Sequence, residues 1–333
     1  MAEPLLKVEH LSTVFSLRGK TPFARPVHLT AVNDVSFTLE AGETLGIVGE
    51  SGCGKSTLGR SILRLIEPTD GKIVWQGRSL TDLSDADMRK ARRDLSIIFQ
   101  DPIASLDPRM TVGQIIAEPL KVAEPSLGRA ARRERVEKVM EEVGLAPEMA
   151  NRYPHEFSGG QAQRIGIARA IVTEPKLIVC DEPVSALDVS IQAQIVNLLK
   201  ALKERMGLTL IFISHDLSVV RLVSDRILVL YLGRVVEIGP RRDVFRRPGH
   251  PYTKALLSAA PIPDPEVART RERTVLEGDP PSPINPPSGC AFRTRCPIAQ
   301  DVCASEPPPL IPVGEGHRAA CLFAEDVVRT GEP

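Results

Sequence analysis

Short apolar runs alternate with longer helical patterns along most of the chain. The short runs occur at residues 43–49, 96–99, 177–181, 209–214 and 227–233. Brief apolar or β-branched runs bounded by turn residues are typical of buried strands in a parallel sheet. Because helical segments separate these runs, the pattern predicts an α/β fold in which helices cover a parallel sheet.

Apolar residues recur at the helical period between these strands. Residues 55–67 are predicted to form a helix directly after the first strand, and two further stretches carry an apolar stripe. The stripes are Val136, Val139, Met140 and Val143 within 112–170, and Ile191, Ile195, Leu198, Leu199 and Leu202 within 190–206. Such a stripe is the face that a helix packs against a core. We expect the second helix to pack on the sheet and the 112–170 segment to form an inserted helical subdomain.

The composition of the chain changes near residue 260. Thirteen of the 29 prolines lie between Pro261 and Pro312, and four of the 6 cysteines follow Gly289. We therefore predict a main domain at residues 1–259, with the helical subdomain at about 101–170, and a Cys/Pro-rich C-terminal extension at 260–333.

Composition and charge exclude several classes of protein. With 42% hydrophobic and 25% charged residues in 333, the chain can bury a sizeable core. Its 42 basic and 42 acidic side chains cancel, so no overall field attracts nucleic acid or anionic lipid. The apolar runs are shorter than the ~18 residues that cross a bilayer, and the opening residues lack the pattern of a secretory leader. We expect a cytoplasmic protein that neither spans a membrane nor binds nucleic acid.

A glycine-rich motif lies between the first predicted strand and helix. The sequence GESGCGKS at residues 49–56 fits GxxxxGK[ST], the phosphate-binding loop (P-loop). Its backbone N–H groups and the start of the helix surround phosphate oxygens, Lys55 adds positive charge, and Ser56 can bind Mg²⁺. By chance the motif arises in roughly 1% of chains of this length, and its position makes chance a poor explanation. The predicted ATP-binding residues here are Gly49, Ser51, Gly52, Cys53, Gly54, Lys55, Ser56 and Thr57.

Polar residues end three of the other predicted strands. Asp181 and Glu182 end LIVCDE, His215 follows TLIFIS, and Gln100 follows SIIF. A carboxylate at a strand end can orient Mg²⁺, and the next one can accept a proton from an attacking water. Asp181 is thus a predicted Mg²⁺ ligand and Glu182 the predicted general base. His215 could contact the γ-phosphate and Gln100 the metal or water, although each alone is an ordinary strand terminus.

A second glycine-rich helix start lies farther along the chain. Residues 157–161 read FSGGQ and precede the helical pattern QAQRIGIARAIV. One nucleotide cannot use two such helix starts in this order within one α/β unit, so we expect the second to serve a nucleotide held by another subunit. The predicted assembly is a head-to-tail dimer with two shared sites.

In this order the motifs resemble the ABC-type ATPases. The resemblance implies a P-loop NTPase (RecA-like) core with an N-terminal antiparallel β subdomain and an inserted helical subdomain. It also implies that the SALD turn, residues 185–188, crosses the dimer interface with Asp188, and that Phe15 stacks on adenine. Ser158, Gly159, Gly160 and Gln161 would contact the partner's ATP. The signature departs from the usual pattern by reading FSGGQ rather than LSGGQ and by having Ala162 where a basic residue is common.

Longer segments resemble the ATPase subunits of dipeptide/oligopeptide importers over essentially the whole chain. They include FQDPIASLDPRMTVGQIIAEPL, HPYTKALLSAAP and LEGDPPSPINPPSGCAFRTRCP, and PSPINPP is similar to the F-type subunit. The resemblance implies a peripheral protein on the cytoplasmic face of the membrane, paired with a D-type ATPase beneath two permeases that receive peptide from a binding protein. The coupling helix of a permease would dock near residues 100–109. Nickel chelates or glutathione are alternative cargoes, and a non-transport ABC ATPase or a regulatory nucleotide-binding subunit is an alternative class.

Four cysteines lie in the C-terminal extension, apart from Cys53 and Cys180. They are Cys290, Cys296, Cys303 and Cys321. A short Pro-rich segment in a reducing compartment suggests stabilisation by a metal. The importer resemblance implies a [4Fe-4S] cluster on these four thiolates. Zinc, with His317 as a substitute ligand, and reduced structural thiols remain alternatives.

Overall fold

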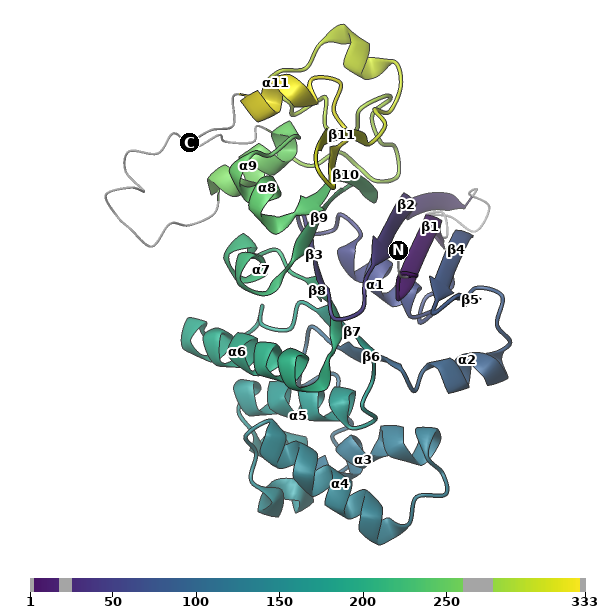
Figure 1. The fold of residues 1–333 in the computed structure, drawn as a ribbon, viewed down its shortest axis with the longest axis vertical. Helices are drawn as coiled ribbons and strands as arrows, with labels where there is room; N and C mark the ends of the chain where they lie inside the picture. Colours follow the sequence, from purple (N-terminus) through teal and green to yellow (C-terminus); the bar gives the residue numbers. More distant parts are fainter. Residues whose placement is uncertain (1–2, 18–25, 260–277, 330–333) are drawn as a thin grey trace. The chain divides into compact units, whose positions relative to one another are not determined.

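The computed structural model describes residues 3–17, 26–259 and 278–329, and it is drawn in Figure 1. The chain forms two compact units. Unit 1 comprises Met1–Leu39, Leu45–Thr81 and His215–Pro333, and unit 2 comprises Glu40–Thr44 and Asp82–Ser214. The predicted boundary at 259/260 and the first part of the extension, residues 260–277, lie outside the described residues.

Unit 1 contains an antiparallel sheet of four strands in the order β2-β1-β4-β5. The strands are β1 (Leu6–Leu17), β2 (Val27–Leu39), β4 (Asp70–Trp75) and β5 (Arg78–Ser79). Residues on one face of β1, among them Leu6 and Val8, are buried, as expected for a sheet that packs one face on a core. A buried hydrogen bond of 2.9 Å between the hydroxyls of Thr13 and Ser61 ties β1 to the helix that follows the P-loop.

A second group of strands in unit 1 carries the P-loop. Strand β3 pairs in parallel with β9, and β9, β10, β12 and β11 follow in antiparallel order. Their bounds are β3 (Thr44–Val48), β9 (Arg226–Tyr231), β10 (Arg234–Pro240), β11 (Ile311–Gly314) and β12 (His317–Ala319). The helices of this unit are α1 (Lys55–Ile62), α7 (Leu217–Val223), α8 (Arg241–Arg246), α9 (Pro251–Ala259), η3 (Asp301–Ala304) and α11 (Ala324–Arg329).

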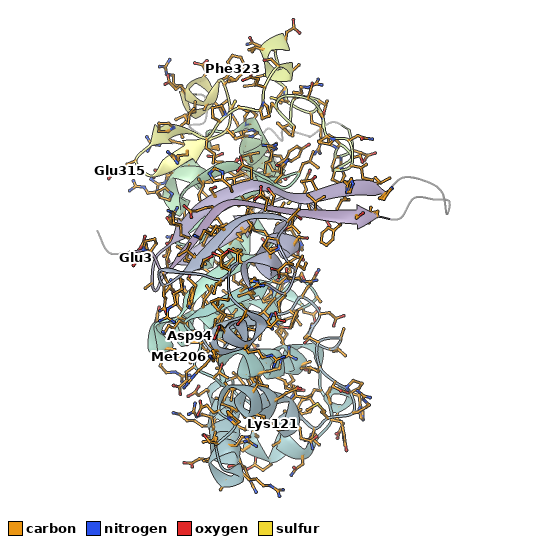
Figure 2. All side chains as sticks on the ribbon, turned by 90° about the vertical axis from the view of Figure 1, so that its right-hand side faces the viewer. Glu3, Asp94, Lys121, Met206, Glu315 and Phe323 are labelled. Carbon is orange, nitrogen blue, oxygen red and sulfur yellow. The ribbon has the colours of Figure 1, made fainter. Side chains whose placement is uncertain are left out.

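Unit 2 combines three parallel strands with a group of helices. The strands pair in the order β6-β7-β8. Its elements are α2 (Asp85–Ala91), β6 (Leu95–Ile98), α3 (Val112–Ala123), α4 (Arg129–Glu142), η1 (Pro147–Asn151), η2 (Pro154–Glu156), α5 (Gly159–Ile171), β7 (Leu177–Asp181), α6 (Val189–Met206) and β8 (Thr209–Ile213). Figure 2 labels three residues of this unit: Asp94, which directly precedes β6, Met206, which ends α6, and Lys121 of α3. The side chains of Val136, Val139, Met140 and Val143 are buried, as their helical spacing predicts.

The structure confirms the predicted α/β class and corrects one helix. The helix expected over residues 55–67 ends at Ile62, because Leu63 leaves helical geometry and Arg64 has a positive φ of 48°. In the α6 stripe, Ile195, Leu199 and Leu202 are buried, whereas the other two members are half-buried. Within the described ranges, no helix is both long and apolar enough to cross a membrane.

Candidate nucleotide-binding site

The P-loop lies between β3 and α1 in unit 1, so strand, loop and helix follow one another as predicted. A Cβ atom at Gly49 would collide with the carbonyl oxygen of Leu230, and one at Gly54 with that of Ala31. Glycine is therefore required at both positions by close approach of neighbouring backbone. The tip of the loop at Ser51 and Gly52 is exposed. A rigid base with an exposed tip suits a loop that binds phosphate through its backbone.

Lys55 is the first residue of α1 and is only 4% exposed. Its Nζ donates hydrogen bonds to the carbonyl oxygens of Gly49 at 2.8 Å and Glu50 at 2.9 Å. The ammonium group is therefore held against the loop at a helix N-terminus, where two sources of positive potential coincide. Ser56 and Thr57 follow in the first turn of the helix and are half-buried.

Two contacts to this loop were missed by the sequence analysis. The hydroxyl of Tyr252 accepts a hydrogen bond from the backbone N–H of Glu50 at 2.8 Å. The guanidinium of Arg295 forms a double ion pair with the Glu50 carboxylate. Both residues lie in segments that carry the importer resemblance, but nothing in their spacing indicates a contact with residue 50.

Unit 2 brings two of the predicted catalytic residues together. Gln100 Nε2 donates a hydrogen bond of 3.1 Å to Glu182 Oε2. The two residues follow the neighbouring parallel strands β6 and β7, whose carboxyl ends lie at the same edge. Glu182 adopts a positive φ of 47°, and its N–H donates to the carbonyl of Ile213 at 3.0 Å. Backbone and side chain of Glu182 are thus both held in place.

The predicted Mg²⁺ ligands have suitable chemistry. Asp181 ends β7 with only 1% exposure, and its side chain is a carboxylate. Ser56 and Gln100 offer hydroxyl and amide oxygens, which together with carboxylate are the donors that Mg²⁺ prefers. Each of these donor types suits the ion.

The signature residues form the N-terminus of α5. Ser158 caps the helix: its hydroxyl accepts from the N–H of Gln161, whose side-chain oxygen accepts from the N–H of Ser158 at 3.0 Å. This is a capping box, in which the two residues satisfy each other's backbone donors. A Cβ at Gly160 would collide with the Ile191 side chain, so glycine lets α5 approach α6 closely. Ala162 is fully buried, so a small side chain fits there.

The remaining candidates occupy less constrained positions. Asp188 is exposed at the start of α6 and makes no side-chain cap. His215 is exposed in unit 1, just before α7. Asp216 caps the N-terminus of α7. Phe15 lies half-buried on β1, opposite Leu29 of β2.

The predicted [4Fe-4S] cluster is wrong. In the part of the chain that the structure describes, no group of three or more His, Cys, Asp or Glu residues could hold a metal ion. The four cysteines instead line a cavity of about 20 Å³ together with apolar side chains such as Phe292 and Phe323. This volume accommodates about one water molecule.

The thiols sit in a partly apolar setting. Burial raises the pKa of Cys290 and Cys296, and that of Cys321 to about 11, so these side chains are protonated thiols at neutral pH. The zinc alternative fails on the same observation, since no metal-holding group occurs among the described residues. His317 instead pairs with the buried carboxylate of Glu237, its Nε2 lying 2.7 Å from Oε1. The described cysteines are all free thiols.

Comparison with known proteins first defines the class. A sequence model described as "ABC transporter" matches residues 32–185. A solved ATP-binding cassette, a dimer in a post-hydrolysis state bound to ADP and Pi, has a TM-score of 0.64 and 31% identity, covering 71% of this chain and 99% of that chain. The chain is therefore an ABC-type ATPase with a P-loop NTPase fold.

Relatives that match over nearly the whole chain define a narrower family. A model described as "Oligopeptide/dipeptide transporter, C-terminal region" matches residues 236–303. The oligopeptide transport ATP-binding protein OppF of Haemophilus influenzae is 58% identical over 96% of this chain and 97% of its own length. OppF of Salmonella typhimurium is 57% identical over 96% of each chain. The chain belongs to this family of oligopeptide transport ATP-binding proteins.

Proposed function

We propose that this chain is the ATP-hydrolysing subunit that powers import of dipeptides or oligopeptides across the cell membrane. The support comes from relatives named for oligopeptide transport that match over nearly the full length, and from the match of the C-terminal region. The main domain is residues 1–259 and the extension is residues 260–333.

In this proposal the phosphates bind along the P-loop. Residues 49–57 hold the nucleotide, and Phe15 stacks on adenine. Ser56, Asp181 and Gln100 hold Mg²⁺, which when bound neutralises charge on the phosphates. Glu182 accepts a proton from the attacking water and His215 contacts the γ-phosphate.

The signature residues 158–161 and Asp188 serve the ATP of a second subunit. A D-type ATPase is the proposed partner, and two permeases anchor the pair at the cytoplasmic face while a binding protein supplies peptide. ATP then favours a closed dimer because it contacts both halves only when they meet, and hydrolysis removes that preference.

The contact between Gln100 and Glu182 is the single observation that carries the catalytic assignment. A general base must be aimed at its water, and a hydrogen bond of 3.1 Å from Gln100 restrains the Glu182 carboxylate. The positive φ of Glu182 adds a second restraint, since strained backbone of this kind is kept where the surroundings require it.

Glu182→Gln tests the assignment. The variant should bind ATP, remain in a closed dimer with its partner subunit and lose about 10²-fold or more of its ATP turnover, because the proton acceptor is gone. Phosphate release and size-exclusion chromatography with ATP measure the two effects. Uptake of a labelled oligopeptide by cells carrying the variant should fall in parallel, whereas unchanged peptide uptake would contradict the transport role.

Glu174→Gln is the matched control. Glu174 also has a positive φ, 54°, and its carboxylate also accepts a bond from a side chain, Arg135 at 3.4 Å. Its position away from a motif predicts wild-type turnover. Equal turnover in both variants would remove Glu182 from the mechanism.

A further inference from the structure

Arg295 forms a double ion pair with the P-loop. Its Nη1 and Nη2 donate to Oε2 and Oε1 of Glu50 at 2.8 and 3.0 Å. The side chain of Arg295 is 6% exposed and that of Glu50 is 24% exposed. Two parallel bonds between a planar guanidinium and a carboxylate fix direction as well as distance. The contact joins residues 245 positions apart, within unit 1.

Tyr252 holds the backbone at the same point. Its hydroxyl accepts a 2.8 Å hydrogen bond from the N–H of Glu50, so this N–H is directed at Tyr252. Lys55 binds the carbonyl oxygen of the same residue. All polar groups of Glu50, the two of the backbone and the carboxylate, therefore have a protein partner.

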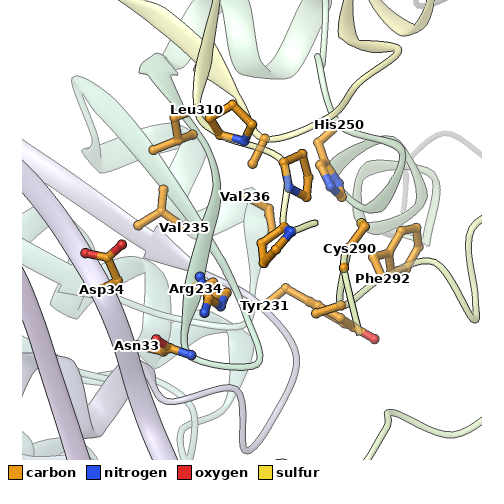
Figure 3. A pocket seen from close by; sticks show the side chains of 16 residues that line it. Asn33, Asp34, Tyr231, Arg234, Val235, Val236, His250, Cys290, Phe292 and Leu310 are labelled. Atoms are coloured by element: carbon orange, nitrogen blue, oxygen red, sulfur yellow. The ribbon is translucent and has the colours of Figure 1, made fainter. Parts of the chain in front are cut away.

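The residues that hold Glu50 belong to a packed aromatic cluster. The Tyr252 ring lies 4.6 Å from that of Tyr231 and 5.3 Å from that of Phe292, which contacts Tyr231 edge-on at 5.3 Å. Figure 3 shows Tyr231, His250 and Phe292 around a pocket of about 140 Å³. Offset and edge-on aromatic pairs are well packed and resist rearrangement. Arg295 follows Phe292 by three residues and so is positioned by this cluster.

A carboxylate inside a phosphate-binding loop needs an explanation. The motif leaves this position open, and an unpaired negative charge here would repel the phosphates of ATP. The partly buried position makes the repulsion stronger than it would be in water. The Glu50 hydrogen bonds raise the pKa of Arg295 further, so its charge is permanent. Arg295 thus cancels the charge that Glu50 brings into the loop.

We propose that Arg295 is a positioning residue for ATP binding, which neutralises Glu50 and, with Tyr252, holds the P-loop in its phosphate-binding form. The segment at residues 290–296 thereby sets the affinity of the ATPase for nucleotide. The role of Arg295 goes beyond the proposed transport function, because it concerns ATP binding alone. It does not depend on which cargo is carried.

A double-mutant cycle tests this role in the full-length protein. Arg295→Met should raise the Kd for ATP about tenfold, with a much smaller change in kcat, because an uncompensated carboxylate then faces the phosphates. Glu50→Gln should change the Kd little. The double variant should return to within about threefold of wild type, since the charge is gone. Titration with a fluorescent ATP analogue measures the Kd and a turnover assay separates KM from kcat.

Salt and a conservative variant separate charge from packing. The defect of Arg295→Met should shrink at high salt because the repulsion is screened. Arg295→Lys keeps the positive charge but loses the two parallel hydrogen bonds of the guanidinium. Its Kd for ATP should lie between that of the wild type and that of Arg295→Met. Arg293→Met is the matched control, because among the described residues the Arg293 side chain bonds only within its own loop, to the carbonyl and hydroxyl of Ser288.

Several results would overturn the proposal. An unchanged Kd in Arg295→Met, an equal loss in Arg293→Met, or a double variant as weak as Arg295→Met would each do so. If Arg295→Met does not fold, Arg295→Lys and Tyr252→Phe still decide, because wild-type ATP affinity in both would exclude a role for this contact. Failure of these variants to change ATP affinity leaves the test of Glu182 untouched, so the two proposals fail separately.

Discussion

The chain contains two glycine-rich helix starts that are built in opposite ways. The P-loop at the start of α1 is held from outside, by Arg295 and Tyr252, and its lysine is buried against it. The signature at the start of α5 holds itself, through the capping box of Ser158 and Gln161. Ser158 is exposed, and within the described part of the chain its hydroxyl bonds only to Gln161 of the same motif.

The difference is consistent with the proposal that the P-loop binds the chain's own nucleotide and the signature binds the nucleotide of a second subunit. A loop that holds its own nucleotide benefits from preorganised donors fixed by the surrounding protein. A surface that meets a nucleotide carried by another subunit must stay accessible, and a local cap keeps the helix end ordered without covering it. The comparison predicts that substitutions at the first start impair binding and that those at the second impair dimer-dependent turnover.

Lys55→Ala should have the largest effect. Removing the ammonium takes away the charge aimed at the terminal phosphates, and ATP turnover should fall about 10³-fold with loss of ATP binding. Phosphate release and nucleotide titration measure it. Lys7→Ala, an exposed lysine of β1 paired with Glu9, is the control and should behave as wild type. A Lys55→Ala protein that still binds ATP normally would contradict the expectation that substitutions in the P-loop impair ATP binding.

The P-loop and the candidates Gln100 and Glu182 could be predicted because a motif and the ends of predicted strands mark them in the sequence. Gly49 and Gly54 are glycines since neighbouring backbone leaves no room for a Cβ, and a motif records such a constraint in sequence. Gln100 and Glu182 meet because parallel strands bring their carboxyl ends to one edge. The pair of Glu50 and Arg295 had no such signal, because 245 residues separate its members and only the fold joins them.

Ser158→Ala should have the next largest effect, and it tests the second half of the comparison. Loss of the cap weakens α5 by about 1 kcal/mol, and loss of the hydroxyl should reduce dimer-dependent turnover at least tenfold with little change in ATP affinity of the isolated chain. Turnover measured as a function of protein concentration, with the partner subunit present, separates the loss of dimer-dependent turnover from the loss of helix stability.

Ser84→Ala provides the matched control for the cap. Ser84 caps α2 in the same way, accepting from the N–H of Asp87 at 3.2 Å, but it lies outside the motifs. Both variants should lose similar stability, and only Ser158→Ala should lose turnover. Equal turnover in the two would assign the signature serine to helix capping alone.

The C-terminal cysteines mark where sequence reasoning failed. Their number suggested a metal centre, but ligation depends on how the thiols are arranged in space. Among the described residues they form no group that could hold a metal ion, and the cavity that they line has room for about one water molecule. Neither the arrangement nor the volume can be obtained from spacing along the chain.

Mild acidification should have the smallest effect of these changes. It should lower the stability of unit 1, which contains the P-loop. His250 packs against Phe292, and its Nδ1 accepts a 3.0 Å bond from the N–H of Tyr252, the residue that holds Glu50. Burial lowers the pKa of His250 from 6.5 to about 3, so the folded state keeps the ring neutral. Between these values the unfolded state binds more protons, and unit 1 loses stability as the pH falls below 6.5.

The loss approaches about 1.4 kcal/mol per pH unit and is absent above pH 7. Trp75, the single tryptophan, is buried on β4 of unit 1, so its fluorescence during denaturant unfolding at pH 7 and pH 5.5 reports this unit. His250→Asn retains an acceptor for the Tyr252 N–H and should remove the part of the pH dependence that His250 contributes. His28→Asn, at an exposed position on β2, should leave the dependence as it is. An unchanged slope in His250→Asn would show that this ring does not contribute, and the acid sensitivity would then come from other titratable groups.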